Sequence, residues 1–370
     1  MQANFDANEN AYLLLTPGPL STSPTVRSAM QRDWCTWDQE YHLIVQDIRS
    51  KLLCLSNGTD DFTTVLMQGS GSFVVESVLW TNLDELSHIL VLVNGAYGAR
   101  MAHMVKGMGR KLTIVDVAEN KQFDPEKIEA VLQTQPGITH IGVVHCETTT
   151  GMLNRYEPLA ALAQQYNKIF ILDAMSSFGG IPIDVTNPPI HFLISSANKC
   201  IQGVPGFGFV IAHKASLEKC KGVSRSHCLD LYDQWNTMEN NSGKWRFTSP
   251  THTVRAFLQA LKELEDEGGV KQRHKRFVEN HHTITESLKE HGINTFLQKQ
   301  DQSPFITAFE EPSSKQFNFD QLYIKLKENG FVIYPGKVSN AATFRIGHIG
   351  HVFPEDFRRL SEVFKEIIFW

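Results

Sequence analysis

Between about residues 60 and 215, the chain alternates short runs of β-branched and apolar residues with longer segments whose apolar residues recur at helical spacing. Such runs are typical of buried strands, and the segments between them are typical of amphipathic helices, for example over 72–83 and 158–166. Strands that alternate with helices predict an α/β fold with a mostly parallel sheet wrapped by helices. The expected strands cover residues 62–68, 88–95, 111–117, 138–146, 168–174, 191–197 and 207–213.

Two features modify this simple alternation. The run over 207–213 follows the preceding loop without a clear crossover helix, so at least one antiparallel pairing is expected. After charged helical stretches over 253–269 and 271–292, the pattern changes to shorter runs such as "INTFLQ", "PFITAF", "FVIYPG" and "ATFRIG", followed by a last helix from Pro354. These predict a compact α+β unit of about 100 residues, with a boundary near residue 268.

Composition and charge exclude several classes of protein. The formal net charge is −5, and no long run of lysine and arginine offers a surface for nucleic acid. No run approaches the ~20 apolar residues of a membrane span, and the start lacks the pattern of a secretory signal, so we expect a cytoplasmic protein that binds small molecules. The six cysteines include no C-x-x-C pair, so neither a disulfide framework nor a zinc site is expected.

The loop "QGSGSF", residues 68–73, follows an expected strand and precedes an expected helix. Ligands of open α/β sheets bind at the carboxyl ends of the strands. Glycines allow close backbone approach, the helix start offers unpaired N–H groups, and Ser70 and Ser72 add hydroxyls, which together suit a phosphate. The loop lacks the spacing of a nucleoside triphosphate or dinucleotide motif, and taken alone it also fits an ordinary turn.

Two charged residues end consecutive strands. Asp173 follows a strongly apolar run, where burial raises the pKa of a carboxyl unless a cation or an N–H faces it. Taken alone, it also fits the cap of the following segment. Lys199 ends the next run, and a lysine in an apolar pocket has a lowered pKa and can form a Schiff base with a carbonyl. Taken alone, Lys199 also fits a solvated surface residue.

Two further loops, 94–100 and 145–151, carry the ring of Tyr97 and the hydroxyls of residues 148–150. A core aromatic and turn-forming threonines are the alternatives for these residues. Together, a phosphate-binding loop, an aromatic ring, a carboxylate and a lysine are the groups needed to hold pyridoxal 5'-phosphate. The lysine binds the cofactor covalently, the carboxylate keeps the ring nitrogen protonated, and the aromatic ring covers the cofactor ring. The order of these motifs therefore predicts a pyridoxal 5'-phosphate site.

Over nearly its whole length, the chain resembles the class V, fold-type I aminotransferases, and most closely the 2-aminoethylphosphonate:pyruvate transaminases. The "DWCTWD" and "KCIQGVPGFGFV" blocks look specific to the phosphonate enzymes. The resemblance implies a seven-stranded large domain over 20–268, and a small α+β domain built from 1–19 and 269–370. Further segments that carry it are "LLLTPGPL", "QGSGSF", "NGAYGARM", "HCETTTGMLN", "ILDAMSSFGGIPID", "RFTSPTHTVRAF" and "FRIGHIG".

The resemblance also implies roles for individual residues. Lys199 matches the Schiff-base lysine, which is also the general acid and base, and Asp173 matches the partner of the ring nitrogen. Tyr97 would stack on the ring, and Thr148 would bond its hydroxyl side. Ser72 stands where the family often has threonine. The implied cofactor-binding residues are Ser70, Gly71, Ser72, Tyr97, Thr148, Asp173, Lys199 and Thr248.

Two positions concern the partner subunit and the substrate. Thr248 matches the position that reaches the phosphate from the partner subunit, which implies a homodimer with shared active sites. Arg345 matches the arginine that binds the acidic group of the substrate, and a guanidinium suits either a carboxylate or a phosphonate. The implied reaction moves the amino group of 2-aminoethylphosphonate to pyruvate and gives phosphonoacetaldehyde and L-alanine. Residues 16–20, "TPGPL", would lie near the mouth of the site.

Four alternatives remain open on the residues. A class V aminotransferase of the serine or alanine–glyoxylate type would share the aspartate, lysine and arginine. A cysteine desulfurase needs a nucleophilic cysteine on a later loop, whereas the last cysteine here is Cys228, and Tyr97 stands where those enzymes usually place histidine. An anion-binding module would use only "QGSGSF" and Lys199. A cofactor-free lysine aldolase would explain Lys199 and would leave the phosphate loop and Asp173 unused.

Overall fold

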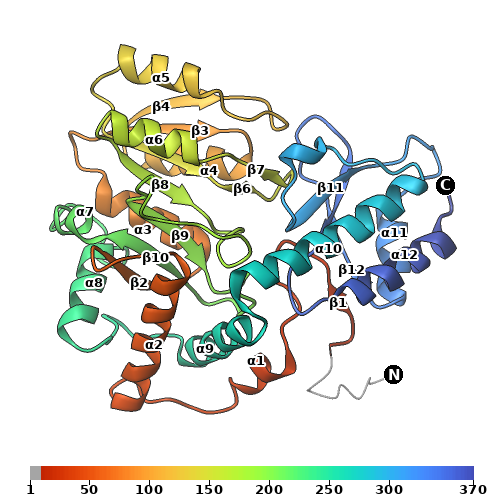
Figure 1. Ribbon diagram of the computed structural model, residues 1–370, viewed down its shortest axis with the longest axis horizontal. Helices are drawn as coiled ribbons and strands as arrows, with labels where there is room; N and C mark the ends of the chain where they lie inside the picture. Colours follow the sequence, from red (N-terminus) through yellow and green to blue (C-terminus); the bar gives the residue numbers. More distant parts are fainter. Residues whose placement is uncertain (1–9) are drawn as a thin grey trace.

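A computed structural model describes residues 10–370, and its centre is a seven-stranded sheet (Figure 1). Neighbouring strands pair in parallel except β10, which runs antiparallel to both of its neighbours. The expected mostly parallel α/β sheet is therefore confirmed, as is the antiparallel pairing of residues 207–213. The strand order is β2 (Phe62–Gln68), β10 (Phe207–His213), β9 (Phe192–Ser196), β8 (Ile169–Asp173), β5 (His140–Val144), β3 (His88–Val93) and β4 (Lys111–Asp116).

Helices cover both faces of this sheet. Every residue of β3, β5 and β9 is buried, which is the pattern of parallel strands enclosed on both sides. Strand β4 lies at the edge of the sheet, and its residues are exposed or half-buried. The helices of this part are α1 (Pro24–Ser28), α2 (Gln39–Leu55), α3 (Gly71–Asn82), α4 (Ala96–Gly107), α5 (Pro125–Thr134), α6 (Glu157–Gln165), α7 (Lys214–Glu218), α8 (Leu231–Asn240) and α9 (Thr251–Asp266).

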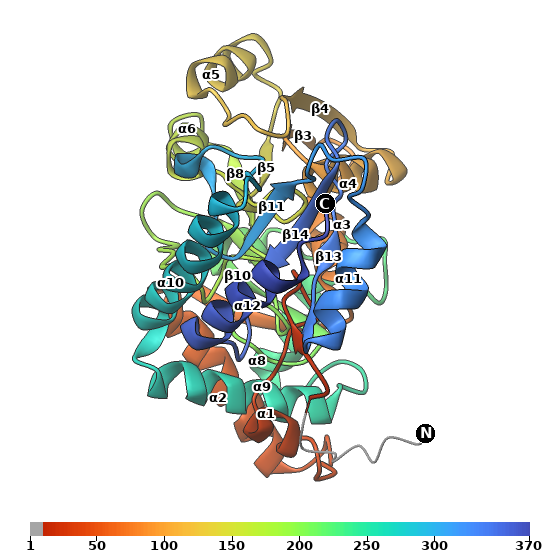
Figure 2. The same ribbon diagram turned by 90° about the vertical axis from the view of Figure 1, so that its right-hand side faces the viewer.

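The C-terminal part of the chain lies beside the large sheet and faces the viewer in Figure 2. Its antiparallel sheet has the order β11 (Ile306–Glu310), β14 (Thr343–Gly347) and β13 (Tyr334–Pro335). Strand β1 (Leu13–Leu14) pairs in parallel with β12 (Phe331–Val332), so residues from near both ends of the chain build this part. The run over 293–298 makes one isolated bridge and no strand. The helices here are α10 (Gly269–Glu290), the short 3-10 helix Lys299–Asp301, α11 (Phe319–Glu328) and α12 (Pro354–Ile367).

Two hydrophobic cores lie on either side of the junction between α9 and α10. The larger core draws its residues from Val26 to Leu261, and the second combines Leu15 with residues from Ile284 to Ile367. A small third cluster, including Leu20, packs between the two parts. These cores support our proposed division into a large domain over 20–268 and a small domain of 1–19 with 269–370, of which residues 1–9 lie outside the described chain.

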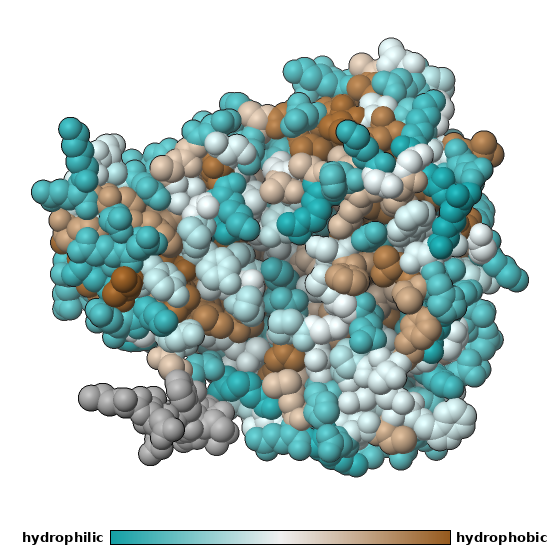
Figure 3. Space-filling model, turned by 180° about the vertical axis from the view of Figure 1, so that it is seen from behind, coloured by the Kyte–Doolittle hydropathy of each residue, from teal (hydrophilic) through white to brown (hydrophobic). Residues whose placement is uncertain are grey.

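The surface of the molecule mixes polar and apolar residues. Figure 3 shows the molecule from behind, where hydrophilic residues cover much of the face and hydrophobic residues form smaller groups between them. Among residues 10–370, no helix is both long enough and apolar enough to cross a membrane.

Candidate active site

A cavity of about 380 Å³ lies where strands of the large sheet end. Strands β8 and β9 are parallel neighbours, so the residues that end them reach the same edge of the sheet. This edge brings together six of the residues expected from the sequence, while Thr148, Thr248 and Arg345 do not line the cavity. The lining includes Ser70, Gly71, Ser72, Tyr97, Arg100, Cys146, Asp173, Met175, Ser176, Ser196, Asn198 and Lys199.

The glycine-serine loop forms one wall of the cavity at the start of α3. Ser70 is the residue before the helix, and its side chain makes no capping bond to the first turn. The N–H groups that open the helix are therefore not capped by Ser70, and the helix dipole favours an anion at this place. Gly69 has a φ of 113°, in the left-handed region that favours glycine. A Cβ added at Gly71 would lie 2.5 Å from the sulfur of Met175, so a larger residue here would require the Met175 side chain to move.

Arg100 supplies a positive charge at this wall that the sequence interpretation missed. Its Nη1 donates a hydrogen bond to Oγ of Ser72 at 3.1 Å, and its guanidinium carbon lies 4.9 Å from the centre of the Tyr97 ring. The signal was present in "NGAYGAR", because residues three apart on a helix lie on the same face. The arrangement therefore combines a helix start, a serine hydroxyl and an arginine at one wall of the cavity.

Asp173 ends β8 and is buried, with 5% of its surface exposed. Its Oδ1 accepts a hydrogen bond from the backbone N–H of Met175 at 3.0 Å. Burial raises the pKa of this carboxyl from 3.8 to about 6, although the N–H of Met175 and the charges of Lys199 and Arg100 act in the opposite direction. A further cationic N–H facing Asp173 in the cavity would stabilise its ionised form.

Lys199 follows β9 in a tight turn and extends into the cavity. Its Nζ donates a hydrogen bond to the carbonyl oxygen of Pro17 at 2.5 Å. Burial lowers the pKa of the ammonium group from 10.5 to about 8, and Arg345 acts in the same direction, while Cys200, Cys146 and Asp173 oppose it. An amine with this pKa is partly neutral near physiological pH and is therefore available as a nucleophile or a base.

Tyr97 lies in the first turn of α4, and a buried glutamate holds the start of this helix. Glu147 is fully buried, and its two carboxylate oxygens accept hydrogen bonds from the backbone N–H groups of Tyr97, at 3.1 Å, and Gly98, at 2.7 Å. Burial raises the pKa of Glu147 to about 7, while these two N–H groups lower it. A Cβ added at Gly95 would lie 2.7 Å from the carboxylate carbon, so glycine makes room for this group. The sequence interpretation missed Glu147, although it lies within "HCETTTG".

Arg345 and Thr148 contact one another outside the lining of the cavity. Arg345 lies on β14 with 2% of its surface exposed, and its Nη1 donates a hydrogen bond to the carbonyl oxygen of Thr148 at 2.9 Å. Its Nε donates to the carbonyl oxygen of Pro335 at 3.0 Å. Of the five N–H groups of the guanidinium, three are left for a further acceptor.

Thr248 lies away from the cavity of its own chain. Its side chain is exposed in a separate hollow that Tyr41, Trp245 and Phe247 also line. The assignment of Thr248 to the site of a partner subunit therefore stays a prediction. The N-terminal segment "TPGPL" does reach the cavity, because a Cβ added at Gly18 would lie 2.7 Å from Nζ of Lys199.

Comparison with known proteins agrees with this geometry. Residues 23–347 match the family of class-V aminotransferases. A "2-aminoethylphosphonate--pyruvate transaminase" of Syntrophobacter fumaroxidans is 55% identical over 97% of this chain and 96% of its own length. A "bifunctional phosphonoacetaldehyde hydrolase/aminoethylphosphonate transaminase" of Clostridioides difficile is 53% identical over 97% of this chain and 57% of its own length.

Solved structures support the same fold class. The crystal structure of pyridoxamine-pyruvate aminotransferase from Mesorhizobium loti superimposes with a TM-score of 0.88 over 98% of this chain and 93% of that chain. The sequence identity is 20%, so this likeness concerns the fold alone. The fold-type I architecture expected from the sequence is thereby confirmed. From the fold, the extent of the family match and the identity to its relatives, we conclude that this chain belongs to the class-V aminotransferase family.

Proposed function

We propose that this aminotransferase carries pyridoxal 5'-phosphate and moves the amino group of 2-aminoethylphosphonate to pyruvate, giving phosphonoacetaldehyde and L-alanine. One observation carries the proposal: Lys199, with a pKa lowered to about 8, and the buried Asp173 line the same cavity as an anion-binding helix start. The names of the relatives from Syntrophobacter fumaroxidans and Clostridioides difficile support the choice of substrates.

The residues around the cavity fit this cofactor. Asp173 suits the protonated ring nitrogen, because a facing cation offsets the burial of its carboxylate. Ser70, Gly71 and Ser72 would hold the phosphate together with Arg100, which the sequence interpretation had not included. The bound cofactor supplies an electron sink for the bond pair released at the substrate carbon. Tyr97 would cover the cofactor ring, and Thr148 would bond its hydroxyl side.

Lys199 has two tasks in this proposal. Its Nζ would hold the cofactor covalently in the resting enzyme, and the amino group of the substrate would release it. The freed Nζ then accepts the proton from the carbon that carries the amino group of the substrate. A pKa of about 8 suits both tasks, because the amine can accept and return a proton near neutral pH.

Arg345 is the proposed contact for the acidic group of each substrate. Both 2-aminoethylphosphonate and pyruvate carry an anionic end, and a guanidinium with free N–H groups can bind either one in turn. The fixed contacts of Arg345 to Thr148 and Pro335 hold its remaining N–H groups in place. We further propose a homodimer in which Thr248 of one subunit completes the phosphate site of the other.

Absorbance measurements on the purified protein loaded with pyridoxal 5'-phosphate test the substrate directly. We expect the visible band of the bound cofactor to disappear on addition of 2-aminoethylphosphonate and to return on addition of pyruvate. Serine serves as the competing donor, because the alternative class V activity uses it with glyoxylate, whereas L-alanine is a product of the proposed reaction and would remove the band by reversal. Loss of the band with serine and not with 2-aminoethylphosphonate would favour that alternative and overturn the proposed substrate.

A further inference from the structure

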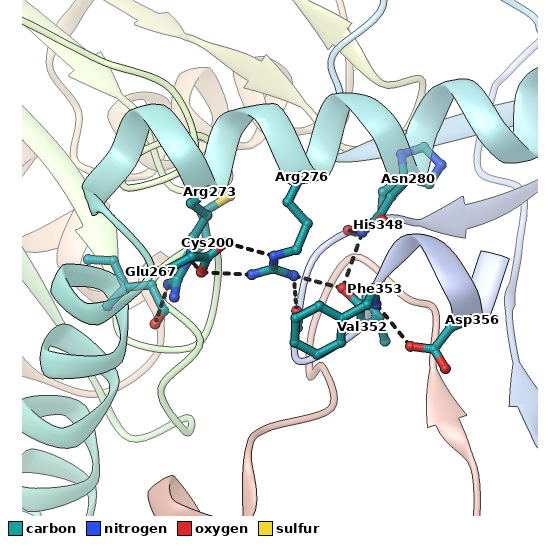
Figure 4. Close-up of polar contacts among 11 residues, drawn as sticks. Cys200, Glu267, Arg273, Arg276, Asn280, His348, Val352, Phe353 and Asp356 are labelled. Atoms are coloured by element: carbon teal, nitrogen blue, oxygen red, sulfur yellow. Dashed lines mark hydrogen bonds and ion pairs between the residues drawn. The ribbon is translucent and has the colours of Figure 1, made fainter.

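An ion-pair cluster with one buried arginine lies outside the cavity, at the junction between the two parts of the chain (Figure 4). We call it the Glu267 cluster, and it consists of Glu267, Arg273 and Arg276. Nε of Arg273 donates to Oε2 of Glu267 at 2.8 Å, and Nε of Arg276 donates to Oε1 at 2.7 Å. Nη2 of Arg276 also donates to Oε2 at 3.0 Å, so one carboxylate binds both arginines. Arg273 is 2% exposed, and burying such a charge is costly unless it has fixed partners.

The first arginine holds the turn that carries the active-site lysine. Nη1 of Arg273 donates hydrogen bonds to the carbonyl oxygens of Cys200 and Ile201, each at 3.2 Å. These carbonyls belong to the two residues directly after Lys199. The turn is otherwise closed by hydrogen bonds of its own, such as Gln202 N–H to the carbonyl of Lys199 at 2.7 Å. Arg273 therefore links this turn to helix α10.

The second arginine holds the loop that follows the strand of Arg345. Nη1 of Arg276 donates to the carbonyl oxygens of Gly350, at 3.0 Å, and Val352, at 2.7 Å. Strand β14, which carries Arg345, ends at Gly347, so this loop begins directly behind it. Figure 4 shows the side chains of Arg273 and Arg276 extending from the same helix toward these two separate stretches of backbone.

The helix that carries both arginines fixes the distance between the two loops. Arg273, Arg276 and Asn280 lie at positions i, i+3 and i+7, which face the same side of an α-helix. Asn280 continues the series, because its Nδ2 donates to the carbonyl oxygens of His348 and Val352 at 3.1 and 3.2 Å. Glu267 sits at the end of α9, just before Gly268 and Gly269, whose φ angles of 98° and 79° turn the chain into α10.

We propose that the Glu267 cluster positions the two ends of the active site relative to each other, with Arg273 acting through the Lys199 turn and Arg276 acting through the Arg345 loop. Neither arginine touches the cavity, so both are positioning residues. This inference rests on the proposed roles of Lys199 and Arg345. Because reacting groups must be held within a fraction of an ångström, a shift of either loop changes the reaction without removing a reacting group.

The two arginines should differ in what their loss changes. A displaced Lys199 turn alters the amine that binds the cofactor and moves the proton, so kcat and the cofactor spectrum should respond. A displaced Arg345 loop alters binding of the acidic end of both substrates, so KM should respond. Asn280 also holds the Arg345 loop, through the carbonyl oxygens of His348 and Val352, so this loop keeps contacts to α10 after Arg276 is changed.

The variants Arg273→Lys and Arg276→Lys test this division. Lysine keeps the positive charge, but it lacks the planar guanidinium whose several N–H groups bond Glu267 and backbone carbonyl oxygens at the same time. Arg358→Lys is the matched control, because Arg358 is exposed on α12 and pairs with Glu355 and Glu279 without contacting either loop. Thermal unfolding establishes that each variant is folded, and Glu267→Gln, which weakens both links, replaces Arg273→Lys if that variant does not fold.

For Arg273→Lys we expect kcat to fall on the order of 10- to 100-fold with little change in KM. The pH at which the visible band of the bound cofactor titrates should shift by about half a unit or more, because the environment of Lys199 changes. For Arg276→Lys we expect KM for both substrates to rise, with the titration of the band unchanged. Arg358→Lys should match the unchanged enzyme in all measurements.

Two results would overturn the proposal. One is a folded Arg273→Lys variant, or its Glu267→Gln replacement, with the cofactor titration and kcat of the unchanged enzyme. The other is an Arg276→Lys variant that shifts the titration as much as Arg273→Lys does, because the two arginines would then not act on separate loops. The titration needs no substrate. It therefore reads the link from Arg273 to Lys199 even if the unchanged enzyme does not accept 2-aminoethylphosphonate, in which case only the proposed substrate fails.

Discussion

The Nζ atom of Lys199 lies 2.5 Å from the carbonyl oxygen of Pro17, a residue 182 positions earlier in the chain. This bond makes the N-terminal segment part of the wall around the active-site lysine. A backbone carbonyl accepts a hydrogen bond and cannot donate one, so it stabilises Lys199 in every state in which Nζ still carries an N–H. The predictions below start from this contact and extend to the other groups around the cavity.

Replacing Lys199 by alanine should abolish turnover. The variant has no amine to bind the cofactor covalently or to move the proton, and general acid–base catalysis alone accounts for about 100- to 10,000-fold in rate. Steady-state assays with 2-aminoethylphosphonate and pyruvate measure the loss, and circular dichroism checks that the variant is folded. Substantial remaining transaminase activity in the folded variant would contradict the role of Lys199.

Replacing Gly18 by alanine should lower the rate by crowding Lys199. A Cβ at this position would lie 2.7 Å from Nζ, and the φ of 120° already disfavours a side chain. Gly222→Ala is the matched control, since Gly222 has a φ of 73° and nothing within 4 Å of the added Cβ. We expect both variants to lose roughly 1 kcal/mol of stability from backbone strain. Only Gly18→Ala should change kcat and the titration of the bound cofactor. Equal kinetics in the two variants would argue against a contact between residue 18 and Nζ of Lys199.

Replacing Asp173 by asparagine should stabilise the cofactor-free chain at neutral pH. The pKa of Asp173 is raised from 3.8 to about 6 in the folded chain, so folding binds a proton between these values. Stability contributed by the protonated form is therefore present below pH 4 and declines as the pH rises toward 6. By pH 7 the difference between the two proteins should approach about 3 kcal/mol.

Urea unfolding of both cofactor-free proteins between pH 4 and pH 7 measures this difference. Asparagine keeps an oxygen that can accept the hydrogen bond from Met175, so the comparison isolates the charge. The same substitution should sharply lower turnover once the cofactor is added, because a neutral amide does not keep the ring nitrogen protonated. If the free energy of unfolding of the unchanged protein and of Asp173→Asn changed with pH in the same way, burial would not raise the pKa of Asp173 and this prediction would be wrong.

Replacing Arg100 by alanine should weaken binding of pyridoxal 5'-phosphate by about tenfold. Charge-assisted hydrogen bonds contribute about 1.5–3 kcal/mol, and the exposure of Arg100 places it at the low end. Lys106→Ala removes the same charge from an exposed position of the same helix, outside the cavity, and should leave the affinity unchanged. Titration of the cofactor-free proteins provides the dissociation constants. Equal affinities in the two variants would rule out Arg100 as a phosphate ligand.

The sheet could be predicted from the sequence because each of its buried strands is a short apolar run that can be recognised without knowing its neighbours in space. Buried parallel strands must be apolar on both faces, and this requirement alone places β3, β5, β8 and β9. Lys199 and Asp173 could be found for a related reason, since a charge at the end of an apolar run stands out. The glycines of the phosphate loop are also local signals, because few other residues fit such a close approach.

The residues that were missed depend on contacts between distant parts of the chain. Glu147 looks like one more polar residue in a turn, and only the fold brings its carboxylate to the start of α4. Arg273 lies in a charged helix where its neighbours face water, and nothing local marks it as buried. The pairing of β1 with β12 joins segments more than 300 residues apart, and two apolar residues carry no information about their partner.

The parallel pairing of β1 with β12 has a consequence for the order in which a newly made chain can become active. Pro17 lies three residues after β1, whose partner strand, Phe331–Val332, is synthesised more than 300 residues later. A growing chain can complete the large sheet and its lysine turn early, as domains generally fold in the order of synthesis. The carbonyl of Pro17 can therefore be fixed beside Lys199 only after β12 has been synthesised and has paired with β1, so the surroundings of the reactive amine are completed after the large sheet.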